Sequence, residues 1–161
     1  MKKIIVTITF TFFILFVNAQ QIPQWKITDI EKKMQASDSN VLVLNFWATF
    51  CKPCVAEIPS FIKIVEKYKK ESVKLILVSV DLPSEYPKKI AAFAKKHQFN
   101  TNISWLDETN ADYFCPKIDA DWSGAIPATL ILNKKTGYRF FTEGEISEAV
   151  FEETLKKAIG K

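Results

Sequence analysis

The chain has 161 residues, of which 48% are hydrophobic and 25% charged, and its formal net charge at neutral pH is +4. This length corresponds to one ordinary domain with a single hydrophobic core. The lysines are spread along the predicted helices and do not form one basic patch, so the sequence gives no support to nucleic-acid binding.

The first 19 residues have the pattern of a secretory signal peptide. Two lysines precede an apolar run, Ile4 to Val17, and a small-residue site ending at Ala19 follows. The run is shorter than the roughly 20 residues of a membrane-spanning helix. We therefore expect residues 1–19 to be removed and residues 20–161 to form the mature, periplasmic or secreted domain. An uncleaved membrane anchor is the alternative.

Strands and helices alternate along the rest of the chain, as hydrophobic periodicity predicts. Helices are predicted over Trp25 to Gln35 (capped by Thr28 or Asp29), Cys51 to about Lys70, Pro87 to His97, Thr109 to Ile118, and from the cap Ser147 to Ile159. On the second of these helices, the stripe predicted to face the core consists of Phe61, Ile62, Val65 and Tyr68. Strands are predicted over Val41 to Ala48, Val73 to Val80, Ile103 to Leu106, Thr129 to Leu132 and Tyr138 to Thr142. This order predicts an α/β domain with a right-handed βαβ unit.

A Cys-x-x-Cys motif, Cys51-Lys52-Pro53-Cys54, lies between the first predicted strand and the helix after it. Cysteines three apart in a first helical turn share one face and are close enough to form a disulfide. The helix N-terminus and Lys52 stabilise a thiolate there, and Pro53 suits a first turn. We expect the outer Cys51 to be the nucleophile and Cys54 to be the resolving thiol. The motif predicts dithiol–disulfide chemistry without a further cofactor.

A zinc site and a purely structural disulfide are the two other uses of such a pair. Zinc would need two more ligands, and the remaining candidates, Cys115 and His97, are isolated in the sequence. A structural disulfide closing so short a loop would constrain little of the unfolded chain. We therefore predict no metal. Cys115 is expected to be either a buried hydrophobe or a free thiol.

Two segments resemble a known family. The sequence NFWATFCKPCVAEIP resembles the active site of thioredoxin-fold proteins, and most closely the secreted TlpA/ResA-like thiol–disulfide oxidoreductases. Gly124 to Thr129 resembles the segment that carries the cis-proline of that fold. The resemblance implies a thioredoxin-like fold, with a central mixed β-sheet flanked by helices. The long interval from Asp81 to Pro127 resembles the insertion of that branch between the third strand and the cis-proline.

The resemblance also implies a third catalytic residue, Glu57, in the pattern Cys-x-x-Cys-x-x-Glu-x-Pro. Glu57 shares the helical face of the cysteines. If it is partly buried, its pKa would be raised and it could shuttle a proton to or from Cys54. A solvated glutamate paired with Lys63 is the alternative. Asn45 stands where thioredoxin carries a buried aspartate, which shifts the proton-handling role towards Glu57.

The substrate would bind beside the disulfide. A cis bond at Ile126-Pro127 would expose the backbone of Ile126 to an extended peptide, whereas an ordinary trans turn proline is the alternative. Two aromatic residues, Trp47 and Phe50, are expected to wall the site, although either could belong to the core. Phe50 stands where these families often have tryptophan. Lys52 and Pro53 complete the expected substrate-binding residues.

The resulting expectation is a secreted or periplasmic enzyme that exchanges disulfides with protein substrates through Cys51 and Cys54, as a reductant. It would be recharged by an upstream electron-donor protein, act as a monomer and have no membrane span after cleavage. A peroxiredoxin-type peroxidase is one alternative, but it needs a Thr-x-x-Cys arrangement after a proline. A copper-binding chaperone of similar fold is the other, and it would want Cys-x-x-x-Cys spacing and a downstream histidine. The sequence supplies neither pattern.

Overall fold

The computed structural model describes residues 21–36 and 40–161. The predicted signal peptide and its cleavage site lie outside the described residues. Within these two ranges, no helix is long and apolar enough to cross a membrane.

A six-stranded mixed sheet forms the centre of the domain, in the order β1-β4-β3-β2-β5-β6. Its strands are β1 Gln24–Trp25, β2 Val41–Trp47, β3 Val73–Ser79, β4 Asn102–Leu106, β5 Ala128–Asn133 and β6 Tyr138–Glu143. Strands β1 to β4 run parallel, and β5 and β6 pair antiparallel to their neighbours. Every residue of β2 is buried, because strands flank it on both sides and helices cover both faces. This near-continuous apolar sequence is typical of a strand covered on both faces.

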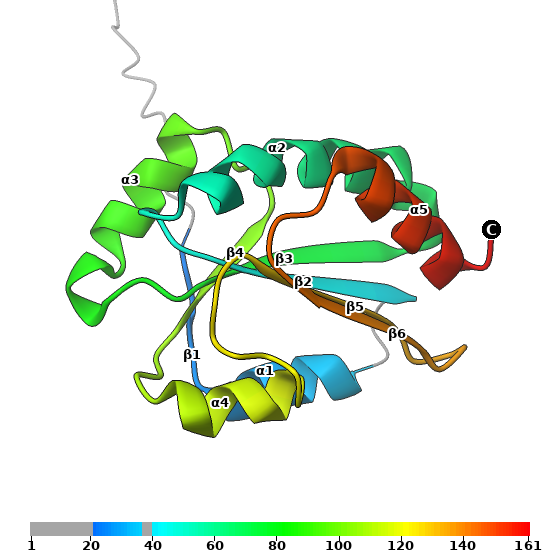
Figure 1. Ribbon diagram of the computed structural model, residues 1–161. Helices are drawn as coiled ribbons and strands as arrows, with labels where there is room; N and C mark the ends of the chain where they lie inside the picture. The colour runs from blue at the N-terminus through cyan, green and yellow to red at the C-terminus, as the bar shows by residue number, and fades with distance from the viewer. Residues whose placement is uncertain (1–20, 37–39) are drawn as a thin grey trace, which may run out of the picture.

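Helices cover both faces of the sheet, as Figure 1 shows: α2, α3 and α5 lie on one face, and α1 and α4 on the other. They are α1 Ile27–Gln35, α2 Lys52–Lys67, α3 Lys88–Lys96, α4 Ala111–Ile118 and α5 Glu148–Ile159, with short 3₁₀ helices at Lys69–Glu71 and Pro83–Glu85. Each face carries its own cluster of buried apolar side chains. The predicted mixed sheet flanked by helices is confirmed. The two helices and the strand predicted between Asp81 and the cis-proline are present as α3, β4 and α4.

The start of the domain differs from the prediction. Gln24 and Trp25 are not helical but form β1, which pairs with Trp105 and Leu106 of β4. Two residues carry no readable periodicity, and their partners lie far along the chain, so the sequence does not reveal this strand. Helix α1 therefore begins at Ile27. Its cap is not Thr28 or Asp29: the cap position is Lys26, whose N–H donates to the Asp29 carboxylate at 3.0 Å.

The core-facing side of α2 is also shifted from the predicted stripe. Phe61 and Tyr68 are buried as predicted, but Ile58 and Ile64 take the other core positions. Ile62 and Val65, which were expected in the core, are only partly buried. The helix buries the positions 54, 57, 58, 61 and 64, which is the spacing of one face of a 3.6-residue helix. This face carries Cys54 and Glu57 as well.

Candidate active site

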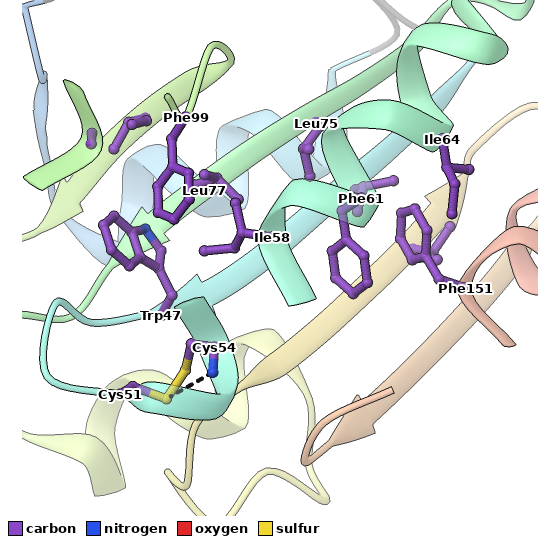
Figure 2. Close-up of a cluster of buried hydrophobic side chains, with 14 of the residues drawn as sticks. Trp47, Cys51, Cys54, Ile58, Phe61, Ile64, Leu75, Leu77, Phe99 and Phe151 are labelled. Atoms are coloured by element: carbon purple, nitrogen blue, oxygen red, sulfur yellow. Dashed lines mark hydrogen bonds between the residues drawn. A yellow bond between two sulfur atoms is a disulfide. The ribbon is translucent and has the colours of Figure 1, made fainter. Parts of the chain in front are cut away.

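Cys51 and Cys54 form a disulfide at the N-terminus of α2, with their Cα atoms 5.3 Å apart. Cys51 is the N-cap residue, and its Sγ accepts a hydrogen bond from the backbone N–H of Cys54 at 3.3 Å, as Figure 2 shows. Cys51 is 6% exposed and Cys54 is fully buried. The predicted order, with an outer and an inner cysteine, therefore agrees with the structure. An N–H pointing at the outer sulfur favours the thiolate form of that residue.

The turn that leads from β2 into the disulfide is fixed by a buried carboxylate, Asp81, which follows β3. Asp81 accepts hydrogen bonds from the Thr49 backbone N–H at 3.0 Å and from its hydroxyl at 2.6 Å, and another from the Ser79 hydroxyl at 2.7 Å. Asp81 is 3% exposed. This role is not among the sequence predictions, in which Asp81 only marks the start of the interval before the cis-proline. The sequence feature that could have indicated this role is a charged residue directly after a predicted buried apolar strand.

Glu57 is buried one turn beyond the disulfide and is only 4% exposed. Burial raises the pKa of its carboxyl group to about 7, opposed by hydrogen bonds from the Ile146 N–H and the Asn45 amide, while the charge of Glu145 raises it further. The solvated alternative does not apply, because Lys63 pairs with Glu148 at 3.4 Å. A carboxyl group with a pKa near neutrality exchanges protons readily in either direction.

Asn45, on β2, connects Glu57 to the sheet. Its Nδ2 donates to Glu57 Oε1 at 2.9 Å and to the Thr129 hydroxyl at 3.0 Å. Thr129 is the register partner of Asn45 on β5. The second carboxylate oxygen, Oε2, accepts from the Ile146 N–H at 3.2 Å. The three elements β2, β5 and α2 therefore meet at one buried polar cluster beside the disulfide.

The predicted substrate-binding residues divide into surface and core. Phe50 is 70% exposed, and Lys52 and Pro53 are also exposed. The Ile126–Pro127 bond is cis, and Ile126 packs against the core cluster that contains both cysteines.

Trp47 lies entirely within the core and offers no surface to a peptide. Its ring centroid is 6.0 Å from that of Phe93 and 5.4 Å from that of Phe99, as part of the cluster in Figure 2. Trp47 therefore takes the core role that the sequence left open.

Cys115 and His97 stand apart from the disulfide. Cys115 belongs to the buried cluster on the opposite face of the sheet from Cys51 and Cys54. Burial raises the pKa of its thiol to about 11, with further contributions from Glu143 and Asp112. His97 stacks on Phe93 at the end of α3. Within the part of the chain that the structure describes, no three potential metal ligands form a group.

Comparison with known proteins gives a consistent set of matches. The AhpC/TSA family model matches residues 18–137. A thiol–disulfide oxidoreductase ResA of Geobacillus kaustophilus is 33% identical over 139 residues, covering 83% of this chain and 74% of its own. A ResA of Bacillus cereus is 26% identical over 144 residues, covering 87% of this chain and 73% of its own.

Solved structures match as well. The thioredoxin-related protein from Neisseria meningitidis serogroup B superposes with a TM-score of 0.67 at 28% identity, covering 80% of this chain and 91% of that one. StoA from Bacillus subtilis gives a TM-score of 0.55 at 23% identity, over 75% and 86% of the two chains, and supports the fold.

Proposed function

Because the chain belongs to the AhpC/TSA family and is a thiol–disulfide oxidoreductase similar to ResA, we propose that it reduces disulfides in protein substrates through Cys51 and Cys54. The observation that carries this proposal is the Cys51–Cys54 disulfide at the N-terminus of α2, with the buried Glu57 one turn further along the same helix. A buried helix N-terminus stabilises a thiolate, and a neighbouring carboxyl group can take up or release the second proton.

In the reduced enzyme, the Cys51 thiolate attacks one sulfur of the substrate disulfide and releases the other as a thiolate. The N–H of Cys54, which points at Cys51 Sγ in the disulfide form, and the charge of Lys52 support the attacking thiolate. Cys54 then loses its proton to the Glu57 carboxylate and attacks Cys51 Sγ. The bond between Cys51 and the substrate breaks, and the two substrate thiolates take up one proton from Glu57 and one from water. The substrate thus leaves as a dithiol, and the enzyme retains the Cys51–Cys54 disulfide. Substrate reduction and enzyme oxidation thus involve two electrons each.

The substrate peptide is proposed to lie across the exposed end of α2. Phe50 supplies an exposed aromatic surface one residue before the nucleophile, and Lys52 and Pro53 follow it. The backbone at Ile126 and Pro127 is proposed to pair with an extended segment of the substrate, as the family resemblance implies.

We also propose that the protein works outside the cytoplasm as a monomer and is recharged by an electron-donor protein. The lysine-led apolar segment from Ile4 to Val17 supports export. The intact mass of the exported protein tests this, since removal of residues 1–19 is expected and a retained segment would mean a membrane-anchored enzyme.

Replacement of the resolving cysteine tests the proposed reaction. In Cys54→Ser the second step cannot occur, so mixed disulfides between substrates and Cys51 should accumulate. Non-reducing gels and mass spectrometry of the captured adducts provide the measurement.

Two variants serve as controls for this experiment. Cys51→Ser should capture little, and Cys115→Ala, which alters a cysteine on the other face of the sheet, should reduce insulin as well as the unaltered protein does. Equal capture by Cys51→Ser would reverse the roles assigned to the two active-site cysteines.

A further inference from the structure

Only the nitrogen of the Asn45 side-chain amide makes hydrogen bonds, and its oxygen makes none to the described residues. Asn45 is fully buried, and its Nδ2 makes two hydrogen bonds, to Glu57 and to Thr129. Its Oδ1 is buried without a hydrogen-bond partner among the described residues. A buried polar atom without a partner is unfavourable, so its presence beside an ionisable group calls for a reason.

The hydrogen bonds of Glu57 indicate which of its two forms the site suits. Oε2 faces the backbone N–H of Ile146, which can only donate. Oε1 faces Asn45 Nδ2, which also only donates in this orientation. The arrangement therefore suits the carboxylate. When Glu57 is protonated, one oxygen becomes a donor, and it needs an acceptor in place of an N–H.

Asn45 can provide that acceptor without moving its backbone. A half-turn of the amide exchanges Oδ1 and Nδ2, which places Oδ1 opposite Glu57 Oε1 and the Thr129 hydroxyl. Oδ1 has two lone pairs, and the hydroxyl of Thr129 can donate as well as accept. Glu57 and Thr129 are thus satisfied in both orientations, and each orientation leaves one end of the amide unbonded. An apolar residue at this position could serve neither form.

We propose that Asn45 is a positioning residue whose side-chain amide turns over when Glu57 gains or loses its proton, so that both forms of Glu57 are held beside Cys54. This inference rests on the proposed role of Glu57 in proton transfer. The charged neighbour that acts on Glu57 is Glu145, in the segment before α5, and Cys54 lies one turn earlier on the buried side of α2. The hydrogen bonds that Glu57 receives come from Ile146 and Asn45, and of these two donors only the Asn45 amide can also accept.

Nuclear magnetic resonance of the reduced protein tests the coupling directly. The Glu57 side-chain carboxyl carbon and the Asn45 side-chain amide should titrate with the same midpoint. The amide signals of Asn133, the other buried strand asparagine, should stay constant, because its Nδ2 is held by the Ala158 carbonyl at 2.8 Å. In Glu57→Gln the Asn45 titration should disappear. A Glu57 titration with an unmoved Asn45 amide would overturn the inference and leave the proposed function intact.

A pair of variants gives an independent kinetic readout. In Asn45→Ala the carboxylate loses a charge-assisted hydrogen bond and the acid loses a weaker one, so the midpoint of the pH–rate profile should rise by about one pH unit, a tenfold change in ionisation. Asn133→Ala removes a comparable buried amide and should lose stability at an unchanged midpoint. An unchanged midpoint in a folded Asn45→Ala protein would refute the positioning role. If Asn45→Ala does not fold, the amide titration of the unaltered protein decides.

Failure of the proposed function has a different signature. If Glu57 does not titrate near neutral pH, its role as proton carrier and the inference on Asn45 are both wrong. Capture of substrates on Cys51 in Cys54→Ser would still support disulfide exchange in that case, because it requires only the two cysteines.

Discussion

At the scale of single residues, the carboxyl group of Glu57 shows how burial changes an ionisable side chain. Glu57 is packed between α2 and the sheet, where desolvation outweighs two hydrogen bonds and raises its pKa to about 7. In the unfolded chain the same carboxyl group has its ordinary pKa of 4.5, so the ionised form is less favourable in the folded state than in the unfolded state. A site residue that is unfavourable for stability in its charged form is a common feature of catalytic centres.

This burial predicts a pH dependence of stability. Between about pH 4.5 and pH 7 the folded state binds more protons than the unfolded state, so the free energy of unfolding falls as the pH rises. The difference of about 2.5 between the two pKa values corresponds to at most about 3 kcal/mol, less where water reaches the carboxylate. Glu57→Gln should remove this fall in the free energy of unfolding with rising pH. Denaturant unfolding of the oxidised protein at several pH values measures it.

Glu57→Gln and the unaltered protein are compared by the slope of the free energy of unfolding against pH, because glutamine also changes the hydrogen bonds at every pH. Glu153→Gln is the matched control: this residue is exposed on α5 and should leave the slope of the unaltered protein essentially as it is. Parallel curves for Glu57→Gln and the unaltered protein would mean that Glu57 ionises normally in the folded state.

At the scale of elements, the junction between β2 and α2 is held by a neighbouring strand. Cys51 donates its N–H to the Ala48 carbonyl at 3.1 Å, and Thr49 in between is bound by Asp81. Asp81 is in turn held by Ser79 at the end of β3. The position of Cys51 thus depends on the pairing of β2 with β3 as well as on the local sequence.

Removal of this carboxylate should affect both stability and activity. Asp81→Ala leaves the Thr49 N–H, its hydroxyl and the Ser79 hydroxyl without their acceptor, with an expected loss of about 2–4 kcal/mol in the free energy of unfolding. Insulin reduction should slow, because the turn before Cys51 is released.

Asp81→Asn retains an oxygen for Thr49 and an amide that can donate to Ser79, so its losses should be smaller. Asp121→Ala, which removes an exposed carboxylate, is the control and should behave as the unaltered protein. Similar stability in Asp81→Ala and Asp121→Ala would show that the Thr49 contact contributes little.

At the scale of the whole molecule, the sheet separates the Cys51–Cys54 disulfide from the third cysteine, Cys115. The cluster beneath α2, α3 and α5 contains Cys51 and Cys54 and the stacked rings of Phe61 and Phe151, whose centroids are 3.9 Å apart. Cys115 lies in the cluster on the side of α1 and α4. The two-sided core therefore holds the disulfide and a third, free thiol on opposite faces of one sheet.

The direction of electron flow is a property of this whole site. A couple is strongly oxidising when its reduced form is highly stabilised, and Lys52 at the helix terminus acts in that direction. The buried Glu57 opposes further negative charge nearby when it is ionised. We therefore expect a reduction potential nearer to about −270 mV, as in thioredoxin, than to about −120 mV, as in a strong oxidant.

Equilibration with glutathione buffers measures this potential, with thiol labelling or the fluorescence of Trp47, which packs in the same cluster as the disulfide, as the readout. The Cys115→Ala background ensures that only one couple is titrated. A potential above about −180 mV would be incompatible with a reductant and would favour isomerase or oxidase activity.

Features that depend only on neighbours along the chain could be predicted from the sequence. The run Val41 to Ala48 predicts a buried strand, observed as Val41–Trp47, and the cysteines predict a helix entrance. Ser147 caps α5 as expected, with its hydroxyl accepting from the Val150 N–H at 3.3 Å. Each of these patterns spans only a few neighbouring residues. Cys51, Cys54 and Glu57 could therefore be assigned to one helical face.

Features that depend on contacts between distant segments became known only from the tertiary structure. The burial of Trp47, the pairing of β1 with β4, and the contacts of Asp81 and Asn45 with other elements leave no local pattern, because each joins side chains or strands far apart in sequence. The pKa of Glu57 belongs to this group as well: its helical position was readable, but its desolvation depends on the sheet beneath it and on Ile146 of the segment before α5. Position along a helix is a local property, whereas burial is set by the packing of the whole fold.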